Sequence, residues 1–507
     1  MAGEGDSAEF ERFAAFLADP ATHGGTRPER IDTHTAAVFL AGERAFKLRR
    51  PVDYGFLDYS TRARRRASAL REIAENSRTA PGLYLGLAGI GDAPPRLIPP
   101  PAPESAEPVV LMRRFDAAGL FDRMAAQGRL DAGLMHATGK AVADMHRSAP
   151  ARPCLRPLPE LALAEVSAID RLASVIGDAA APVARLLREH GRRLAPAAAA
   201  RPARRCHGDL HLRNIVLWQG RPAPFDCIDF NDELTDIDPL YDLAFLMMDL
   251  DHRGRRDLAS VTFNAWAERM AADGEGEQVA YGGLGLLPLY RACRAAIRAK
   301  VAGLTVETCG GEGAADEARA YAELARGYLE APRRPRLIAV GGLSGSGKST
   351  LARALAGPLD AVVLRSDAIR KAMWGAEEAE RLPKDAYAPE VSTEVYATMA
   401  RRARMALAGG ATVILDAAHL REAEREAVAA LAAEAGAAFT GLWLDAPKAT
   451  LTARVEARAG DVSDADARVV AMQAGYDLGK ICWTRLGADD GPARVAETAR
   501  TAISRND

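Results

Sequence analysis

A phosphate-binding loop is the clearest chemical signal in the sequence. Residues 342–349 read GLSGSGKS and match the pattern GxxxxGK[ST] at every fixed position. Glycines let backbone N–H groups wrap around phosphate oxygens, the lysine reaches the β- and γ-phosphates, and the serine hydroxyl can ligate Mg²⁺. A plain Gly/Ser turn explains the pattern less well, because a predicted strand and a predicted helix flank the loop. We therefore expect nucleotide binding by Gly342, Ser344, Gly345, Ser346, Gly347, Lys348, Ser349 and Thr350, with Ser349 also on the metal.

Charged residues downstream could complete a site for phosphoryl transfer. Asp367 follows a predicted strand and could orient or deprotonate an acceptor hydroxyl, and Arg370, one helical turn later, could hold the acceptor or its phosphate. Asp416 ends another strand and suits a metal or water contact. Arg454 and Arg458 precede a polar loop, where a lid would supply arginines. The plainer interpretations stay open: a helix cap near Asp367, a turn at Asp416 and solvated arginines.

A second constellation lies far upstream. Residues 207–214 read HGDLHLRN and have the Asp-x-x-x-x-Asn spacing of a kinase catalytic loop. Asp209 would accept the proton of an acceptor hydroxyl, and Asn214 would hold Mg²⁺. Asp229, in the segment CIDF, would be a further metal ligand, since Mg²⁺ prefers hard oxygen donors. Asp226 is interpreted as structural.

This upstream constellation also needs a cation for the phosphates. Lys47 lies on the second strand of a predicted hairpin over residues 35–49, where a lysine can pair with the α- and β-phosphates. Glu72, on the following helix, is its natural partner, with Glu75 as the competing choice. Lysine is scarce in this chain, and Lys47 and Lys348 both fall where a compact ammonium can contact phosphate oxygens.

The residues of the upstream site have to be positioned by a mixed lobe and a helical lobe. The pattern predicts a hairpin at 35–49, a helix at 60–77 and strands at 83–90 and 108–115, and then helical stretches at about 120–204 and 238–326. This order predicts an α+β bilobal fold over residues 1–330, with a small lobe at about 1–115 and a helical lobe at about 116–330.

The phosphate-binding loop belongs to a differently patterned half. Residues 331–336 (APRRPR) are predicted as a linker, and residues 337–507 as a separate domain. Apolar strands there alternate with helices, at 337–340, 361–364, 412–415 and 440–444. Uninterrupted apolar strands joined by helices indicate a buried parallel sheet. We expect an α/β P-loop NTPase domain with a parallel sheet and flanking helices.

The composition disfavours several classes of protein. The chain has 66 lysines and arginines against 68 acidic residues, a formal net charge of −2, so nothing favours a nucleic acid as partner. No apolar run of 18 residues occurs, and the N-terminus lacks the basic and apolar regions of a signal peptide. We expect a cytoplasmic protein with no membrane partner. The six scattered cysteines form no metal-binding pattern.

Both halves resemble families of kinases. The motifs GLSGSGKST and SDAIR and the late arginines make residues 335–500 similar to the small P-loop kinases of the gluconate kinase, chloramphenicol phosphotransferase, zeta-toxin and polynucleotide kinase group. The motifs HGDLHLRN, CIDF and DPLYDLA, in that order, make the first half resemble the aminoglycoside phosphotransferase family, which has a protein-kinase-like fold. The segment KLRRPVDYGFLDYSTRARR is similar to a bacterial subgroup of predicted kinases that are often fused to such a P-loop kinase. No GxGxxG loop precedes Lys47, a motif that aminoglycoside-modifying relatives also lack.

Together the two constellations predict a bifunctional kinase, a phosphotransferase with an alcohol group as acceptor. The resemblance implies in-line transfer of the γ-phosphoryl group of ATP or GTP, with Mg²⁺ as cofactor, to small molecules at two separate sites. A sugar, polyol or aminoglycoside-like metabolite is the expected acceptor. Two alternatives stay open: one domain is a nucleotide-binding regulatory module for the other, or the P-loop domain is a toxin-like or nucleic-acid 5'-kinase. The acceptors, the choice of ATP or GTP, and the oligomeric state are left open by the sequence.

Overall fold

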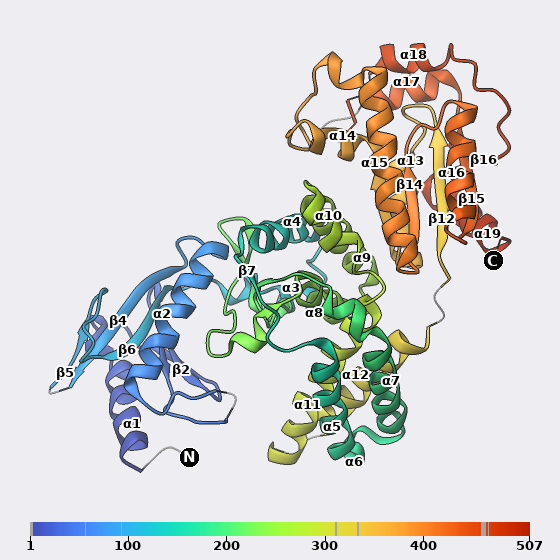
Figure 1. Ribbon diagram of the computed structural model, residues 1–507. Coiled ribbons are helices and arrows are strands. Elements are labelled where there is room, and N and C mark those ends of the chain that lie inside the picture. Colours follow the sequence, from blue (N-terminus) through green and yellow to red (C-terminus); the bar gives the residue numbers. More distant parts are fainter. Residues whose placement is uncertain are drawn as a thin grey trace. The chain divides into compact units, whose positions relative to one another are not determined.

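The chain folds into two compact units. The structure is a computed structural model that describes residues 4–55, 57–92, 94–309, 312–331, 334–457, 463–464 and 466–506 (Figure 1). One unit contains residues 1–156 and 202–242, and the other contains residues 157–201 and 243–507. None of the helices described is long and apolar enough to cross a membrane. The predicted linker at 331–336 falls inside the second unit, with residues 332 and 333 outside the described residues.

A six-stranded antiparallel sheet forms the N-terminal part of the first unit. Its order is β1-β2-β3-β6-β4-β5. The strands are β1 (Glu29–Asp32), β2 (Ala36–Ala41), β3 (Arg44–Arg49), β4 (Tyr84–Asp92), β5 (Pro95–Ile98) and β6 (Glu107–Arg113). The predicted hairpin corresponds to β2 and β3, and the two further predicted strands correspond to β4 and β6.

Helices cover both faces of this sheet. Helix α1 (Glu4–Ala18) packs on the face that carries Phe46 of β3. Helix α2 (Arg62–Thr79) packs on the opposite face. Successive side chains of a strand point to opposite faces, so Lys47 and Arg49 share the face that α2 covers.

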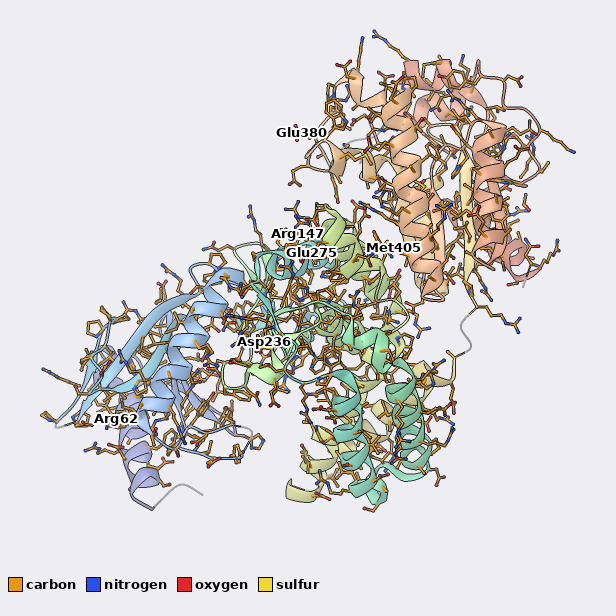
Figure 2. The ribbon with its side chains drawn as sticks, viewed as in Figure 1. Arg62, Arg147, Asp236, Glu275, Glu380 and Met405 are labelled. Atoms are coloured by element: carbon orange, nitrogen blue, oxygen red, sulfur yellow. The ribbon has the colours of Figure 1, made fainter. Side chains whose placement is uncertain are left out.

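Ion pairs fix the start of α2 to the sheet. Arg62, which is labelled in Figure 2, lies at the start of α2. It pairs with Glu9, Asp92 and Glu107. Arg65 Nε lies 2.6 Å from Glu107 Oε1, and both side chains are buried. A buried, hydrogen-bonded pair of this kind holds its two elements in one register, since losing either partner leaves an unpaired buried charge. The position of Glu72, further along α2, is set in this way.

The remaining elements of the first unit are short. They are α3 (Phe121–Ala126), α4 (Ala132–Ser148), a three-stranded sheet of β7 (Ala151–Arg152), β8 (Ala203–Arg205) and β11 (Asp236–Ile237), and a hairpin of β9 (Ile215–Trp218) and β10 (Arg221–Pro224). Residues 206–214 connect β8 to β9, and residues 225–235 connect β10 to β11. The two segments predicted to carry the upstream site therefore both join these short strands. Helix α8 (Pro239–His252) follows and contains the boundary between the units.

A five-stranded parallel sheet organises the C-terminal part of the second unit. Its order is β13-β14-β12-β15-β16, with β12 (Arg336–Gly342), β13 (Val362–Arg365), β14 (Thr412–Asp416), β15 (Ala438–Asp445) and β16 (Thr484–Gly487). Helices α13 (Lys348–Leu359) and α19 (Pro492–Ser504) share one apolar core with the sheet. Helices α15 (Pro389–Ala408) and α16 (Glu422–Glu434) also pack on the sheet. The sequence analysis missed β16, which has four residues and only one buried side chain.

Helices of the predicted kinase-like domain pack in the same unit as this sheet. They are α5 (Leu158–Arg171), α6 (Ala173–Ile176), α7 (Ala180–Ala199), α9 (Arg256–Met270), α10 (Gly274–Tyr281), α11 (Leu287–Cys309) and α12 (Glu312–Glu330). The Asn264 side chain of α9 pairs with the edge strand β13, accepting from Val363 N at 2.7 Å and donating to Ala361 O at 3.1 Å. Arg291 of α11 forms two contacts with Asp360, at 2.8 and 3.1 Å. Polar contacts between residues far apart in sequence therefore join the helices to the sheet.

Replacing Glu277 should weaken this junction. Glu277 of α10 is buried and accepts from Arg401 Nε at 3.0 Å and from Arg402 Nε at 2.9 Å. In Glu277→Gln the buried Arg402 loses its counter-charge, and we expect a loss of about 3 kcal/mol in unfolding free energy. The matched control is Glu275→Gln, at an exposed position of the same helix. Chemical denaturation of the full chain measures both.

The same contact should depend on pH. Burial alone would raise the pKa of Glu277, but hydrogen bonds from Arg401 and Arg402 outweigh burial and lower it. A carboxyl whose pKa is lowered by folding stabilises the fold above its unfolded pKa, and this contribution is lost as the pH falls through the folded pKa. Wild type and Glu277→Gln should therefore converge in stability under acidic conditions. A stability difference that is unchanged by acid would contradict this account.

Candidate active sites

A single buried carboxylate holds the loop HGDLHLRN of the first unit. Asp242 accepts the backbone N–H of His207 at 3.0 Å and that of Gly208 at 2.9 Å. Gly208 has a φ of +83°, and a Cβ there would lie 2.8 Å from the carbonyl oxygen of Leu234. The loop therefore requires glycine at this position, and its shape is fixed by the backbone contacts.

The loop brings Asp209 and Asn214 together. Asn214 Nδ2 donates to Oδ2 and to the backbone oxygen of Asp209, both at 2.9 Å. This directs the amide nitrogen to Asp209 and leaves the amide oxygen, a hard donor, for a cation. The Asp209 side chain is 40% exposed, so an acceptor can reach it.

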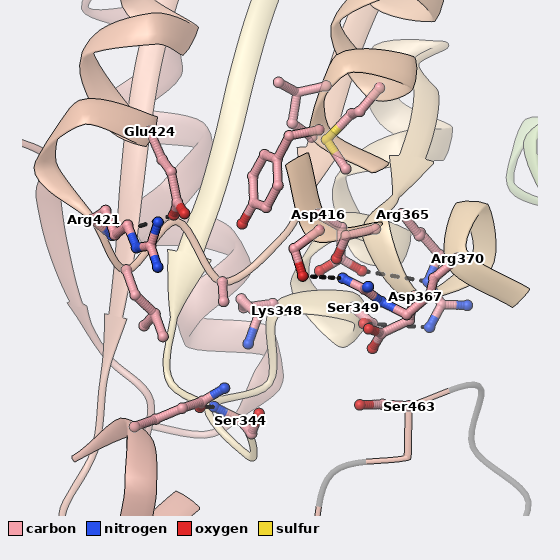
Figure 3. Close-up of a pocket in the computed structure, with 18 of the residues that line it drawn as sticks. Ser344, Lys348, Ser349, Arg365, Asp367, Arg370, Asp416, Arg421, Glu424 and Ser463 are labelled. Atoms are coloured by element: carbon pink, nitrogen blue, oxygen red, sulfur yellow. Dashed lines mark hydrogen bonds and ion pairs between the residues drawn. The ribbon is translucent and has the colours of Figure 1, made fainter. Parts of the chain in front are cut away.

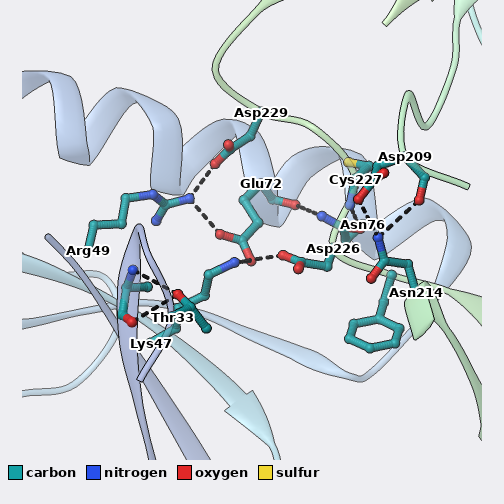
Figure 4. Close-up of polar contacts among 12 residues, drawn as sticks. Thr33, Lys47, Arg49, Glu72, Asn76, Asp209, Asn214, Asp226, Cys227 and Asp229 are labelled. Atoms are coloured by element: carbon teal, nitrogen blue, oxygen red, sulfur yellow. Dashed lines mark hydrogen bonds and ion pairs between the residues drawn. The ribbon is translucent and has the colours of Figure 1, made fainter. Parts of the chain in front are cut away.

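Lys47 forms an ion pair with Glu72. Lys47 Nζ lies 2.9 Å from Glu72 Oε1 and 2.6 Å from Asp226 Oδ1 (Figure 4). Burial alone would lower the pKa of Lys47, but the charges of Asp226 and Glu72 outweigh burial and raise it. Glu75, the competing choice, pairs with Arg78 at 2.6 Å. The lysine is thus held in its charged form on the face of the sheet that α2 covers.

Asp229 does not face an open site, in contrast to its predicted role as a metal ligand. Its Oδ1 accepts from the Tyr59 hydroxyl at 3.0 Å, and its Oδ2 accepts from the Ser68 hydroxyl at 2.7 Å and from Arg49. Only 7% of its side chain is exposed. Arg49 also contacts Glu72 Oε2 at 2.5 Å. Asp229 therefore anchors a buried polar cluster, and its oxygens are occupied by protein donors.

Asp226, which the sequence analysis interpreted as structural, directs its carboxylate to Lys47. Figure 4 shows its side chain between Lys47 and Asn214, and its charge and that of Asp209 act on each other. Partial desolvation alone would raise its pKa, but the ammonium of Lys47 outweighs this effect and lowers it. Its φ of +59° is rare for a residue with a side chain and is typical of constrained functional positions. The available signal was the pair of carboxylates three residues apart in FDCIDF.

The phosphate-binding loop of the second unit connects β12 to α13 as predicted. Gly342, Gly345 and Gly347 have φ values of +139°, +85° and +93°. A Cβ on Gly345 would lie 2.6 Å from the carbonyl oxygen of Leu451. Glycine is therefore required here by both backbone conformation and space, and the loop can present its N–H groups at the N-terminus of α13.

Neighbouring groups contact the polar atoms of this loop. Lys348 Nζ donates to the carbonyl oxygen of Leu343 at 2.9 Å. The N–H of Ser344 donates to Gln473 Oε1 at 2.8 Å, from helix α18 (Ala467–Gln473). A bound phosphate would compete with Gln473 for this N–H. The sequence analysis did not identify Gln473, which carries no motif.

The side chains of Ser349 and Asp416 both lie next to the same positively charged group, the guanidinium of Arg365. The guanidinium of Arg365, at the end of β13, lies 3.4 Å from Ser349 Oγ and 3.4 Å from Asp416 Oδ2 (Figure 3). A hydroxyl and a carboxylate that together surround a positive charge are a suitable oxygen donor set for Mg²⁺. Arg365 was also missed, although it directly precedes the predicted Ser366-Asp367 pair.

Asp367 lies at the start of helix α14 (Ser366–Met373), in the same cleft as Lys348. Burial raises the pKa of Asp367, and a hydrogen bond from the Ser463 hydroxyl acts in the opposite direction. Arg370 is buried, with Nη1 2.5 Å from the carbonyl oxygen of Ala386 and its guanidinium 4.9 Å from the centre of the Tyr387 ring. Arg370 therefore lines the cleft and is also held in its wall by contacts with Ala386 and Tyr387.

Only one of the two arginines that were predicted to belong to a lid lies within the described residues. Arg454, in helix α17 (Lys448–Glu456), donates to the carbonyl oxygen of Ala488 at 2.9 Å and lies 3.5 Å from Asp489. Arg458 lies outside the described residues. Arg454 does not line the cleft of about 790 Å³ that contains Lys348, Asp367 and Arg370.

Family models match both halves of the chain. The model described as a phosphotransferase enzyme family matches residues 31–278, and the model described as an AAA domain matches residues 337–477. Uncharacterized proteins of Mycobacterium tuberculosis and Mycobacterium bovis are 32% identical to this chain over 468 residues, which is 88% of this chain and 90% of theirs.

Solved structures of kinases are similar to each part separately. A choline/ethanolamine kinase family protein from Mesorhizobium loti covers 64% of this chain and 96% of its own, with 18% identity and a TM-score of 0.41. A gluconokinase from Sinorhizobium meliloti covers 34% of this chain and 94% of its own, with 22% identity and a TM-score of 0.26. The mycobacterial relatives show that this chain belongs to their family, and in this chain a region of the phosphotransferase enzyme family precedes an AAA-domain region.

Proposed function

We propose that the protein is a bifunctional kinase that transfers the γ-phosphoryl group of ATP or GTP to hydroxyl groups of small molecules at two separate sites. One observation supports this most strongly: two separate places each gather a lysine for the phosphates, a carboxylate for the acceptor hydroxyl and oxygen donors for a cation. The acceptors that we propose are sugars, polyols or aminoglycoside-like metabolites.

At the first site, Asp209 takes the proton of the acceptor hydroxyl as its oxygen attacks the γ-phosphorus. The bond from the γ-phosphorus to the bridging oxygen breaks, and the nucleoside diphosphate leaves. Lys47, positioned by Glu72, contacts the phosphates. Asn214 and Asp226 would hold Mg²⁺, in place of the predicted pair Asn214 and Asp229. When bound, Mg²⁺ neutralises charge on the phosphate oxygens.

Charge at the first site supports this metal assignment. Lys47 and Arg49 are two cations among three carboxylates, those of Glu72, Asp226 and Asp229, so the cluster keeps one net negative charge. Asp226 is 48% exposed at its side chain and is the only one of the three that is not deeply buried. The uncompensated charge therefore lies where a cation can reach it.

At the second site, Asp367 takes the proton of the acceptor hydroxyl as its oxygen attacks the γ-phosphorus. The bond from the γ-phosphorus to the bridging oxygen breaks, and the nucleoside diphosphate leaves. Lys348 and the N–H groups of the loop hold the phosphates. Ser349 and Asp416 would hold Mg²⁺ directly or through water, which requires Arg365 to leave its present position. Arg370 is proposed to support the acceptor. Arg454 is proposed to contact the transferring group, which requires it to leave Ala488 and Asp489, and Arg458 keeps the role that the sequence predicts.

A labelling experiment tests both sites in one chain. A metabolite extract is incubated with γ-labelled ATP and the wild type, Asp209→Asn or Lys348→Ala. A labelled product that is lost only in Asp209→Asn comes from the first site, and one that is lost only in Lys348→Ala comes from the second. The control is Lys448→Ala, an exposed lysine of the same domain as Lys348, which should keep both products.

Two results would contradict the proposal. If wild type forms no acceptor-dependent product, neither site is a small-molecule kinase under these conditions, and the proposal is wrong. If products form but are insensitive to one of the two substitutions, the corresponding site is not a phosphotransfer centre.

A further inference from the structure

The cleft around Lys348 extends to both sides of this residue. Figure 3 shows Asp367, Arg370 and Ser463 on one side of Lys348, and Arg421 and Glu424 on the other. The side with Asp367 is polar and contains the proposed base. The other side contains neither the proposed base nor the proposed metal ligands. Its shape should therefore indicate which other part of a ligand the cleft binds.

Helix α16, which carries Glu424, and helix α15 give the cleft apolar walls. Helix α15 contributes Met399 and Ala400, and helix α16 contributes Ala427, Val428 and Leu431. We call the space between these five residues the apolar arm. Alanines at two of the five positions keep the helices' side chains short, and this leaves space that larger residues would fill.

Large exposed side chains gather at the same cleft. Tyr387, Met472 and Tyr476 are 44%, 54% and 48% exposed, and all three line it. Aromatic and methionine side chains left in water around one cleft are typical of a surface that a ligand covers. They provide an observation that is independent of the apolar arm.

Charge on this side of the cleft is balanced. Among the described residues from α16 and its N-cap that line the cleft, Arg421 and Glu424 are charged, and Glu424 Oε2 accepts the backbone N–H of Arg421 at 3.2 Å. With one cation and one anion, these two residues give α16 and its N-cap no net charge at the cleft, so they select for no strongly charged group. A ligand group that is apolar, with no more than uncharged polar atoms at its edge, therefore fits this side best.

We propose that the acceptor of the P-loop site is an amphipathic alcohol. Its hydroxyl end lies at Asp367, and an aliphatic or aromatic body lies in the apolar arm. The continuity of the arm with the reacting end of the cleft makes the acceptor itself the occupant. This inference rests on the proposed phosphotransfer function and narrows the acceptor from any polyol or sugar to one with an apolar substituent.

The test uses full-length protein and a metabolite extract that is partitioned between 1-butanol and water. Each fraction is incubated with γ-labelled ATP, and the products that disappear in Lys348→Ala are followed. We expect such a product from the butanol fraction. Ala427→Trp, which fills the apolar arm from an exposed position on α16, should lower kcat/KM for this product by about tenfold or more, because a pocket that no longer fits an apolar group loses that group's binding.

The matched control is Ala430→Trp, an exposed alanine of the same helix that does not line the cleft. It should leave kcat/KM unchanged, and both variants should keep the wild-type KM for ATP. A Lys348-dependent product found only in the water fraction, or equal kcat/KM in the two tryptophan variants, would contradict the binding of an apolar acceptor group in the apolar arm. Neither result would contradict the kinase proposal. The absence of any Lys348-dependent product in either fraction would overturn the kinase proposal for this site, and this inference with it.

Discussion

Asp226→Asn is expected to lower kcat at the first site by at least about a hundredfold, while the loss of its exposed ion pair with Lys47 lowers the unfolding free energy by no more than about 1 kcal/mol. A metal held on phosphate oxygens contributes several kcal/mol to the transition state, and each 1.36 kcal/mol corresponds to a tenfold change in rate. Asparagine keeps the shape of the side chain and removes the exposed charge beside Lys47. The Mg²⁺ concentration for half-maximal activity should rise. Steady-state kinetics at several Mg²⁺ concentrations measures both effects.

Asp229→Asn is the matched comparison, because the two carboxylates are three residues apart in one segment. Asp229 is buried against Arg49, Tyr59 and Ser68. Removing its charge leaves Arg49 in a buried site with one carboxylate fewer, and we expect a loss of about 3 kcal/mol in unfolding free energy. The Mg²⁺ concentration for half-maximal activity should stay near the wild-type value. If instead Asp229→Asn changes the Mg²⁺ dependence and Asp226→Asn does not, Asp229 is the metal ligand.

Asp367→Asn is expected to lower kcat at the P-loop site by about 10²- to 10⁴-fold, the usual contribution of a general base. A base has to be deprotonated to act, and burial raises the pKa of Asp367. Wild-type kcat should therefore rise with pH through a limb that lies above the ordinary range of an aspartate. The limb should be missing in Asp367→Asn. A pH–rate profile for a Lys348-dependent product provides the measurement.

Ser463→Ala gives the sharper version of this test. The Ser463 hydroxyl donates to Asp367 and so favours its charged form. Without this hydrogen bond the pKa of Asp367 should rise further, and the limb of the pH–rate profile should move to higher pH. An unchanged limb in Ser463→Ala, or a limb that survives in Asp367→Asn, would show that another group titrates.

The sequence predicted the fold class and the contiguous parts of both sites. Residues 342–349 and 207–214 are short loops whose residues act together because they are neighbours in the chain. Their motifs therefore determine their chemistry, and the structure shows the phosphate-binding loop between a strand and a helix as expected. The pairing of Lys47 with Glu72 was also predicted, because a strand and the next helix lie close together in a bilobal kinase-like fold.

The extent of the second unit was not predictable from local patterns. The predicted boundary at 331–336 follows a change in composition, yet Asn264, Glu277 and Arg291 each contact residues of the P-loop region. Such contacts join residues about 70 to 125 positions apart in the chain. Hydrophobic periodicity reports which face of an element is buried, and it carries no information about the partner.

The different surroundings of Asp226 and Asp229 show most clearly what only the tertiary structure decided. Both carboxylates belong to the segment FDCIDF, and a motif cannot state the direction in which each side chain points. The left-handed turn at Asp226 directs its carboxylate to Lys47, whereas Asp229 meets Arg49 from a strand 180 residues earlier. The sequence by itself determined which chemical groups are present and which of them act as neighbours. Their exposure, their charge partners and the apolar arm between α15 and α16 depend on contacts between distant segments, which form only when the chain packs.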